Sequence, residues 1–367
     1  MSGLAFNTVA QLIEAIGTGR MVVITDDEHN GEGSLLMAAE QAGAEAVTFM
    51  AVQARGLICL ALTEQRCRAL GLDLMVPNSR AQHGVGFTRS IEAATGVSTG
   101  ISAADRARSI QVAVDPASGP ADLVQPGHIF PVQALPGGVM QRAGHVEAAC
   151  DLTRLAGLQP AATLVGILNE DGELARGAEL HEFAQRHDLR IGTIADLIHY
   201  RILHEGTIER GGEYPLRTRH GEFQVTTYQD TYQGSLHLAL VKGRIDSSQL
   251  VLVRVQGIET LRDVLGCESE QWTLDRSLAS IAAAGSGVLV LLAQKESAEG
   301  VLEQLRQRSA GKHRAPQFPQ RTLGIGAQIL RDQNVRKIRL MSSPVPYTAV
   351  SGFDLEVTEF VPFQPAV

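Results

Sequence analysis

The chain has 367 residues, of which 44% are hydrophobic and 20% charged, and its formal net charge is −8. This composition is typical of globular proteins and excludes a chain that is disordered throughout, and the length predicts two domains of about 150 residues or more each. Because acidic residues outnumber basic ones and aromatic residues make up only 4%, nucleic acids and anionic membranes are not expected as partners.

The first half of the chain alternates helical and strand patterns. Apolar residues at helical spacing predict helices, and short runs of β-branched residues predict strands. In chain order these are a helix at 6–16 with Asn7 or Thr8 as N-cap, a strand at 21–25, a helix at 34–42, a strand at 46–50, an apolar run at 57–62, a helix at 64–70, strands at 110–114 and 127–134, a helix at 146–156, a strand at 163–168, and helices at 175–186 and 194–204.

The second half begins after a weakly apolar stretch at 205–220, which is rich in Gly, Arg and Glu and predicts a linker. Its elements are strands at 223–232, 236–242 and 250–255, a helix at 274–284, a strand at 287–292, a helix at 325–333 and a strand at 337–341. The expected fold class is α+β or mixed α/β. The two domains, 1–204 and 221–367, would each hold a mixed sheet with flanking helices.

The cysteines and the N-terminus predict a cytoplasmic protein. The cysteines, at positions 59, 67, 150 and 267, form no CxxC pair, which indicates free thiols in a reducing compartment. No apolar run reaches the ~18 residues needed to span a bilayer, and the N-terminus lacks the basic and long apolar segments of a signal peptide. A soluble protein is therefore expected.

An acidic cluster follows the strand at 21–25. Asp26, Asp27, Glu28, His29 and Glu32 lie within seven residues, beside a turn that contains glycines. Carboxylates at a strand end suit Mg²⁺ that is bound together with several waters. The alternative is a solvated acidic loop, which is the commoner meaning of such a run.

Two histidines lie in glycine-containing segments, Gly127-His128 and Gly144-His145, and His145 precedes a helix. A histidine in such a place can act as a general acid or base or as a metal ligand, while a structural role is the alternative.

The small-residue stretch 99–106 opens a helix. Its N–H groups could bind phosphate, or its Ser and Thr side chains could serve only as ordinary helix caps. Cys59 lies in an apolar run, where a buried inert thiol is the simpler interpretation.

Together these segments resemble 3,4-dihydroxy-2-butanone 4-phosphate synthase over residues 5–204. The matching stretches are GRMVVITDDE (19–28), ARGLICLALT (54–63), GFTRSIEA (86–93), TGVSTGISAADRARSI (95–110), PGHIFPVQALPGGVMQRAGHVEA (126–148) and NEDGELAR (169–176). From residue 217 the chain resembles GTP cyclohydrolase II, through HLALVKG (237–243), GIGAQILRD (324–332) and KIRLM (337–341). In this order the two halves are similar to the bifunctional riboflavin-biosynthesis family.

The resemblance implies a lyase that converts ribulose 5-phosphate, or a similar small phosphosugar, into 3,4-dihydroxy-2-butanone 4-phosphate and formate. It also implies a homodimer and a requirement for Mg²⁺, with Mn²⁺ as an alternative. The residues it carries over are His128, His145, Glu32 and Cys59 as catalytic; Arg142, Thr99, Asp105, Asp27 and Glu147 as substrate-binding; and His145, Glu32 and Asp26 as metal-binding.

Some positions depart from the two family patterns. In the first domain, Asn30 and Gly166 stand where the pattern has glutamates, and Val146 stands where it has threonine. These changes predict an altered active site. In the second domain, the three zinc cysteines of the pattern fall on Glu259, Glu270 and Trp272, and its Gln-Glu-Gly-Arg-Gly-Ile-Gly segment is replaced by residues 294–300. The second domain is therefore expected to bind no zinc and to hydrolyse no GTP.

Three functions remain open on this basis. The first is lyase or isomerase chemistry on a phosphosugar in the N-terminal domain. The second is a repurposed enzyme of a specialised pathway with a different substrate. The third is a non-catalytic regulatory paralogue in riboflavin biosynthesis.

Overall fold

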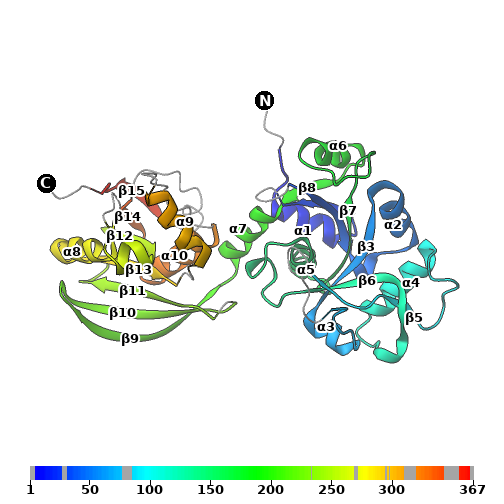
Figure 1. The fold of residues 1–367 in the computed structure, drawn as a ribbon, viewed down its shortest axis with the longest axis horizontal. Helices are drawn as coiled ribbons and strands as arrows, with labels where there is room; N and C mark the ends of the chain where they lie inside the picture. Colours follow the sequence, from blue (N-terminus) through cyan, green and yellow to red (C-terminus); the bar gives the residue numbers. More distant parts are fainter. Residues whose placement is uncertain are drawn as a thin grey trace. The chain divides into compact units, whose positions relative to one another are not determined.

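The computed structural model describes residues 5–26, 31–76, 85–232, 234–267, 272–293, 296, 298–309, 320–342 and 355–363. The chain divides into two compact units, Met1–Tyr200 and Arg201–Val367. Each unit holds a mixed sheet with helices, as the fold class predicted (Figure 1). Among the described residues, no helix is both long and apolar enough to cross a membrane.

The first unit is built from α1 (Val9–Gly17), β1 (Val22–Thr25), β2 (Gly33–Ala38), α2 (Ala44–Phe49), β3 (Arg55–Thr63), α3 (Glu64–Ala69), β4 (Gly86–Phe87), β5 (Ile91–Ala93), α4 (Ala103–Val114), β6 (Leu123–Ala134), α5 (His145–Leu155), β7 (Ala161–Ile167), α6 (Ala178–Arg186), β8 (Arg190–Thr193) and the first part of α7 (Ile194–His204). The described strands follow the order β4-β6-β3-β7-β2-β1-β8, and β5 pairs with β6. β2 is antiparallel to β1 and β7, β3 is antiparallel to β7, and β6 is parallel to β3.

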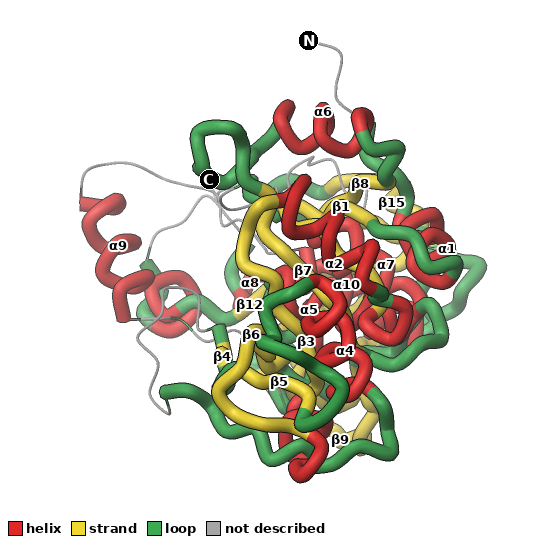
Figure 2. Tube along the Cα trace, turned by 90° about the vertical axis from the view of Figure 1, so that its right-hand side faces the viewer, coloured by secondary structure: helices red, strands yellow, loops and turns green. Residues whose placement is uncertain are grey.

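The sheet of the first unit is covered on both faces. Along β2, Leu35 and Met37 pack into one core, while Leu36 and Ala38 pack into the other. Helices α2 and α4 contribute to the first core, and α1 and α5 contribute to the second (Figure 1). α5 lies against β7, β3 and β2 (Figure 2). This arrangement fixes the start of α5 relative to the central strands.

The second unit contains β9 (Ile208–Thr218), β10 (Gly221–Asp230), β11 (Leu236–Lys242), β12 (Leu250–Gly257), α8 (Leu274–Ala284), β13 (Gly287–Leu292), α9 (Ala298–Ser309), α10 (Gln320–Asp332), β14 (Lys337–Leu340) and β15 (Glu356–Phe360). Its described strands follow the order β15-β14-β12-β13-β11-β10-β9. β12, β13 and β14 are parallel, whereas β9, β10, β11 and β13 pair antiparallel.

Several sequence-based expectations were wrong. Most of the segment 34–42, expected as a helix, lies in β2, and only residues 39–41 form a short 3-10 helix. A strand buried on both faces is continuously apolar and therefore imitates a buried helix. The segments 46–50 and 110–114, expected as strands, lie in helical segments. The second of these ends α4, a 12-residue helix started by the N-cap Ser102, so its β-branched residues follow a helix already begun.

The expectation that residues 205–220 form a linker was also wrong. Residues 208–218 form β9, which pairs antiparallel with β10 through a continuous register apart from one irregularity. β9 is exposed along nearly its whole length. Because an exposed edge strand carries few buried apolar residues, its sequence imitates that of a linker.

Candidate active site

The predicted acidic site lies where β1 ends and β2 begins. Thr25 pairs with Gly33 across these antiparallel strands, so the residues that flank the connecting segment are held together. The backbone N–H of Asp26 donates to the carbonyl oxygen of Glu32 at 3.0 Å. The predicted substrate ligand Asp27 and the altered position Asn30 lie outside the described residues.

His145 reaches this cluster from the first position of α5. Its Nε2 is 3.3 Å from the carbonyl oxygen of Glu32. Burial of the imidazole lowers the pKa of His145, and this outweighs the Glu32 carbonyl and the carboxylates of Asp26, Glu32 and Glu147, which raise it. The lowered pKa favours the neutral imidazole, the form in which a histidine can accept a proton or bind a metal.

Glu147, two residues after His145 in α5, forms an ion pair with Arg142. The guanidinium donates from Nε to Oε2 at 2.9 Å and from Nη2 to Oε1 at 2.5 Å, and the N–H of Leu135 also donates to Oε1. The Glu147 side chain is 1% exposed. Both residues were predicted to bind substrate, which remains a prediction. The contacts in the structure show that they brace the start of α5.

The carboxylate of Glu32 is paired with Arg176, a residue the sequence analysis did not single out. Arg176 donates from Nη2 to Oε1 of Glu32 at 2.8 Å, and the two residues also form an isolated backbone bridge. Arg176 ends the NEDGELAR segment, and that motif was the available signal. The segment after β7 thus closes against the start of β2.

The donors at this edge suit a hard cation only in part. Carboxylate oxygens and one imidazole, from Asp26, Glu32 and His145, are ligands that Mg²⁺ and Mn²⁺ accept. Within the described residues, no group of three His, Cys, Asp or Glu side chains is arranged to hold a metal ion. These residues therefore fit a cation that is bound through few protein ligands and completed by water and substrate.

Cys59 lies in β3, opposite Phe130 of β6 and Leu164 of β7. Burial raises the pKa of its thiol to about 12, so it stays protonated at neutral pH. Its Sγ is 3.7 Å from the carbonyl oxygen of Leu57. This environment favours the inert thiol over a thiolate nucleophile.

A second cluster contains His128, Thr99 and Asp105. The carboxylate of Asp105 accepts hydrogen bonds from the N–H and hydroxyl of Ser98 and from the N–H of Gly100. These bonds, led by the Ser98 hydroxyl, lower the pKa of Asp105. Asp105, predicted to bind substrate, thus shapes the exposed loop that carries Thr99.

His128 is paired with Glu92, which the sequence analysis also missed. Its Nδ1 is 3.0 Å from Oε2 of Glu92, which is in β5. The GFTRSIEA segment was the only signal for Glu92, since 36 positions separate it from His128.

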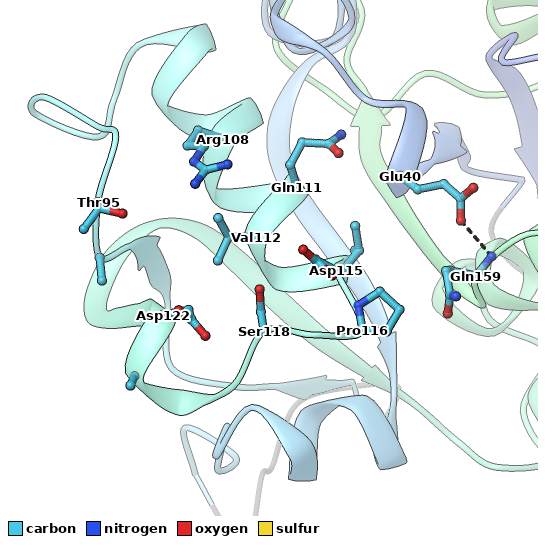
Figure 3. Close-up of a pocket in the computed structure, with 13 residues that line it drawn as sticks. Glu40, Thr95, Arg108, Gln111, Val112, Asp115, Pro116, Ser118, Asp122 and Gln159 are labelled. Atoms are coloured by element: carbon cyan, nitrogen blue, oxygen red, sulfur yellow. Dashed lines mark hydrogen bonds between the residues drawn. The ribbon is translucent and has the colours of Figure 1, made fainter.

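A cavity of about 570 Å³ lies at the C-terminal end of α4 (Figure 3). Among its lining residues, Glu40 follows the end of β2 and Gln159 precedes β7, and the N–H of Gln159 donates to Glu40. The cavity thus lies at the opposite end of the sheet from Glu32. None of the predicted site residues lines it.

In the second unit, two of the three positions aligned with zinc cysteines are engaged in other contacts. Glu259 is paired with the buried Arg262, which also donates to Asp263 at 2.7 Å. The indole of Trp272 donates to the carbonyl oxygen of Val361 at 3.0 Å. Glu270 lies outside the described residues. Cys267 is the only cysteine in the sequence from 201 to 367.

The two mixed sheets define a two-domain α+β protein, whose N-terminal half carries a cluster of histidine and carboxylate side chains at one edge of its sheet. The 3,4-dihydroxy-2-butanone 4-phosphate synthase family matches residues 10–200, and the GTP cyclohydrolase II family matches residues 209–362. The chain belongs to the 3,4-dihydroxy-2-butanone 4-phosphate synthase family, here fused to a domain of the GTP cyclohydrolase II family.

Individual relatives agree with this assignment. A 3,4-dihydroxy-2-butanone 4-phosphate synthase from Pseudomonas aeruginosa is 48% identical over 98% of this chain and 100% of its own. The crystal structure of RibBX, a two-domain 3,4-dihydroxy-2-butanone 4-phosphate synthase from A. baumannii, covers 97% of this chain and 99% of its own, with 42% identity and a TM-score of 0.82. A synthase structure in complex with two magnesium ions covers 53% of this chain and 96% of its own, with 36% identity and a TM-score of 0.51.

Proposed function

We propose that the first unit converts ribulose 5-phosphate into 3,4-dihydroxy-2-butanone 4-phosphate and formate. The observation that carries this proposal is the contact of His145 with the carbonyl oxygen of Glu32, beside Asp26 at the sheet edge. The reaction begins with proton abstraction beside a carbonyl, which requires a base at neutral pH. The name of the Pseudomonas aeruginosa relative supports the same activity.

Each residue has a role in this proposal. His145 accepts and returns protons, while Arg142 and Glu147 hold its helix in place. Asp26 and Glu32 would hold Mg²⁺, or Mn²⁺, so that the one lone pair of the neutral His145 imidazole is left for the proton. When bound, the cation supplies stabilisation of the negative charge that develops on the substrate oxygens. Thr99, exposed in the loop that Asp105 shapes, would contribute a hydroxyl to the binding of the phosphate.

Formate release tests this function. The full chain is incubated with ribulose 5-phosphate and Mg²⁺, with and without a chelator, and formate is followed by proton NMR. The proposal expects formate only when the metal is present. Conversion of the sugar without formate would instead favour isomerase chemistry that stops before the loss of formate. If the sugar is not converted at all, the remaining explanations are a different substrate or a regulatory role.

We also propose that the active site is altered relative to the family pattern. Gly166 pairs with Ser34, two residues from Glu32, and it stands where the pattern has a glutamate. With Asn30 also replacing a glutamate, two acidic groups of the family pattern are missing. Loss of one acid–base group typically lowers a rate by roughly 10²–10⁴-fold. The reaction is therefore expected to be slower than in family members that keep both.

We propose that the second unit is not catalytic. A three-cysteine zinc site needs three thiolates, and Cys267 is the one cysteine in that half of the sequence. The P. aeruginosa and A. baumannii proteins match nearly the whole chain and are named for the synthase alone. Zinc analysis of the purified chain and incubation with GTP are expected to show neither stoichiometric zinc nor GTP hydrolysis.

A homodimer is also proposed. Leu57, Ile101 and Val124 are about half exposed, at 54%, 57% and 48%. Ile101 follows the Thr99 loop, and Val124 lies in the strand that carries His128. The family resemblance implies a homodimer, and exposed apolar side chains of this size are ones that a subunit interface would bury. Light scattering after size-exclusion chromatography is expected to give twice the mass of one chain, 39.3 kDa.

A further inference from the structure

We propose that the cavity at the C-terminal end of α4 binds a small molecule that carries an amino-acid head group at one end and a second cationic group at the other. The cavity lies at the opposite end of the sheet from Glu32, so it is separate from the site of the proposed reaction. Its volume of about 570 Å³ is within the range of roughly 300–1,000 Å³ that is typical of small-molecule sites. Its charged lining residues are one guanidinium, Arg108, and three carboxylates, Glu40, Asp115 and Asp122.

One face of α4 forms the wall that runs along the cavity. Arg108, Gln111, Val112 and Asp115 follow one another at helical spacing, and all four line the cavity (Figure 3). Because seven residues of an α-helix span about 10 Å, the guanidinium-bearing and carboxylate-bearing positions at the two ends of this row are well separated. The wall therefore suits an extended ligand with different charges at its two ends.

The end of the cavity at Arg108 carries charges of both signs. Nε of Arg108 lies 3.3 Å from the position that a Cβ at Gly96 would take, and the N–H of Ala94 donates to the carbonyl oxygen of Asp122 at 2.9 Å. Both charged residues therefore lie beside the segment 94–96 (Figure 3). Among the described residues, Arg108 forms no ion pair. A carboxylate on the ligand can pair with this guanidinium while a neighbouring ammonium group pairs with Asp122.

The other end of the cavity is marked by Glu40, which Figure 3 shows well away from Arg108. The side-chain amide of Gln111 donates to the carbonyl oxygens of Ala39 and Ala42, at 3.1 Å each. These bonds tie the turn that carries Glu40 to α4. The second cationic group of the ligand would thus meet a carboxylate whose position is already fixed, which lowers the entropic cost of binding.

All three carboxylates are oriented by backbone N–H groups. Oε2 of Glu40 accepts from Gln159 at 2.9 Å. Oδ1 of Asp115 accepts from Ala117 at 2.9 Å, and Oδ2 of Asp122 accepts from Gly119 at 2.8 Å. Within the part of the chain that the structure describes, the second oxygen of each carboxylate accepts no hydrogen bond. Since three carboxylates face one guanidinium, the cavity favours a ligand with more cationic than anionic groups.

Isothermal titration calorimetry of the full chain with three probes tests this inference. L-lysine carries the head group and the second ammonium group, cadaverine lacks the carboxylate, and L-norleucine lacks the second ammonium group. L-lysine is expected to bind at one site per chain, at least about threefold more tightly than either of the other probes. No saturable binding of L-lysine, or equal affinity for all three probes, would overturn the inference.

Two variants assign the ends of the ligand. Arg108→Gln is expected to remove the advantage of L-lysine over cadaverine, and Glu40→Gln its advantage over L-norleucine. A glutamine at position 40 can still accept the N–H of Gln159, so only the charge is lost. Glu182→Gln, which removes an exposed carboxylate paired with Arg186 on α6, is the matched control and is expected to bind all three probes as the wild type does.

The unfolding temperature of each variant shows whether it is folded. L-lysine binding that is unchanged in both folded variants would place the ligand elsewhere and overturn the inference. Because binding is measured without turnover, the result does not depend on whether the first unit releases formate.

Discussion

His145 and Glu32 meet although 113 positions separate them, with Nε2 of the histidine 3.3 Å from the glutamate carbonyl oxygen. The contact joins the first residue of α5 to the residue before β2. The contact forms because α5 packs along the central strands. The first residue of α5 therefore lies at the end of the sheet where β1 ends and β2 begins. His145 thus begins a helix, and Asp26 and Glu32 directly flank two paired strands.

The Arg176–Glu32 ion pair predicts an effect on metal affinity. The two side chains are 58% and 26% exposed, and ion pairs of this kind contribute about 0.2–1 kcal/mol. In Arg176→Gln the guanidinium no longer competes with a cation for the Glu32 carboxylate. We expect the Kd for Mn²⁺, measured by electron paramagnetic resonance titration, to fall by up to about fivefold.

The control for this prediction is Arg186→Gln, which removes a comparable exposed pair with Glu182 on α6. Its Mn²⁺ affinity is expected to equal that of the wild type. Weaker binding in Arg176→Gln than in this control would show that the arginine supports the cation site instead of competing with it.

The Arg142–Glu147 pair predicts a large stability effect. Glu147 is fully buried, so Arg142→Ala leaves an uncompensated carboxylate in the core of the first unit. Breaking a buried pair in this way typically costs about 3–5 kcal/mol. Urea unfolding followed by circular dichroism measures it. The double variant Arg142→Met/Glu147→Leu should be less destabilised than Arg142→Ala, and a loss below about 1 kcal/mol in the single variant would refute the argument.

Asp105 predicts a dependence of stability on pH. Its hydrogen bonds lower the pKa of the folded carboxyl below 3.8, so the folded state holds the proton less tightly than the unfolded state. The stabilisation is complete above the unfolded pKa of about 3.9 and is lost as the pH falls through the folded value. The gap in unfolding temperature between wild type and Asp105→Asn should therefore be constant from pH 7 to 5 and shrink below pH 4. A gap that widens on acidification would contradict this.

Gly166 offers a test of the altered site. A Cβ there would meet only Leu174, at 3.4 Å, so a longer side chain can be placed with a small adjustment of that leucine. Gly166→Glu restores the acidic group of the family pattern and is expected to raise the rate of formate release by at least about tenfold. Gly166→Gln, of the same shape without charge, is the control. Equal rates in both variants would show that this position does not limit the reaction.

The fold was partly predictable because its amphipathic helices have local signals. α1 is capped by Thr8 and ends at Gly17, and α8 was predicted with its observed bounds. β2 and the edge strand β9 were missed for opposite reasons: the first is buried on both faces and reads as a helix, while the second is exposed and reads as a linker. In both, pairing with neighbouring strands decided the conformation, and pairing is not a local property.

Only those contacts of the site that join residues close together in the sequence could be predicted. Asp26 and Glu32 were expected to lie close, and the antiparallel pairing of β1 with β2 brings them there. The partners of the reactive residues were not predicted. Glu92 and Arg176 are 36 and 144 positions from His128 and Glu32, and only the folded sheet brings each pair together.

The central claim is that the first unit releases formate through His145, and one comparison tests it most directly. Proton NMR follows formate from ribulose 5-phosphate and Mg²⁺ for the wild type, His145→Asn and the control His199→Asn, which lies in α7. The account predicts formate from the wild type and the control, and a rate roughly 10²–10⁴-fold lower for His145→Asn. Formate from His145→Asn at the wild-type rate, or none from the wild type, would contradict it.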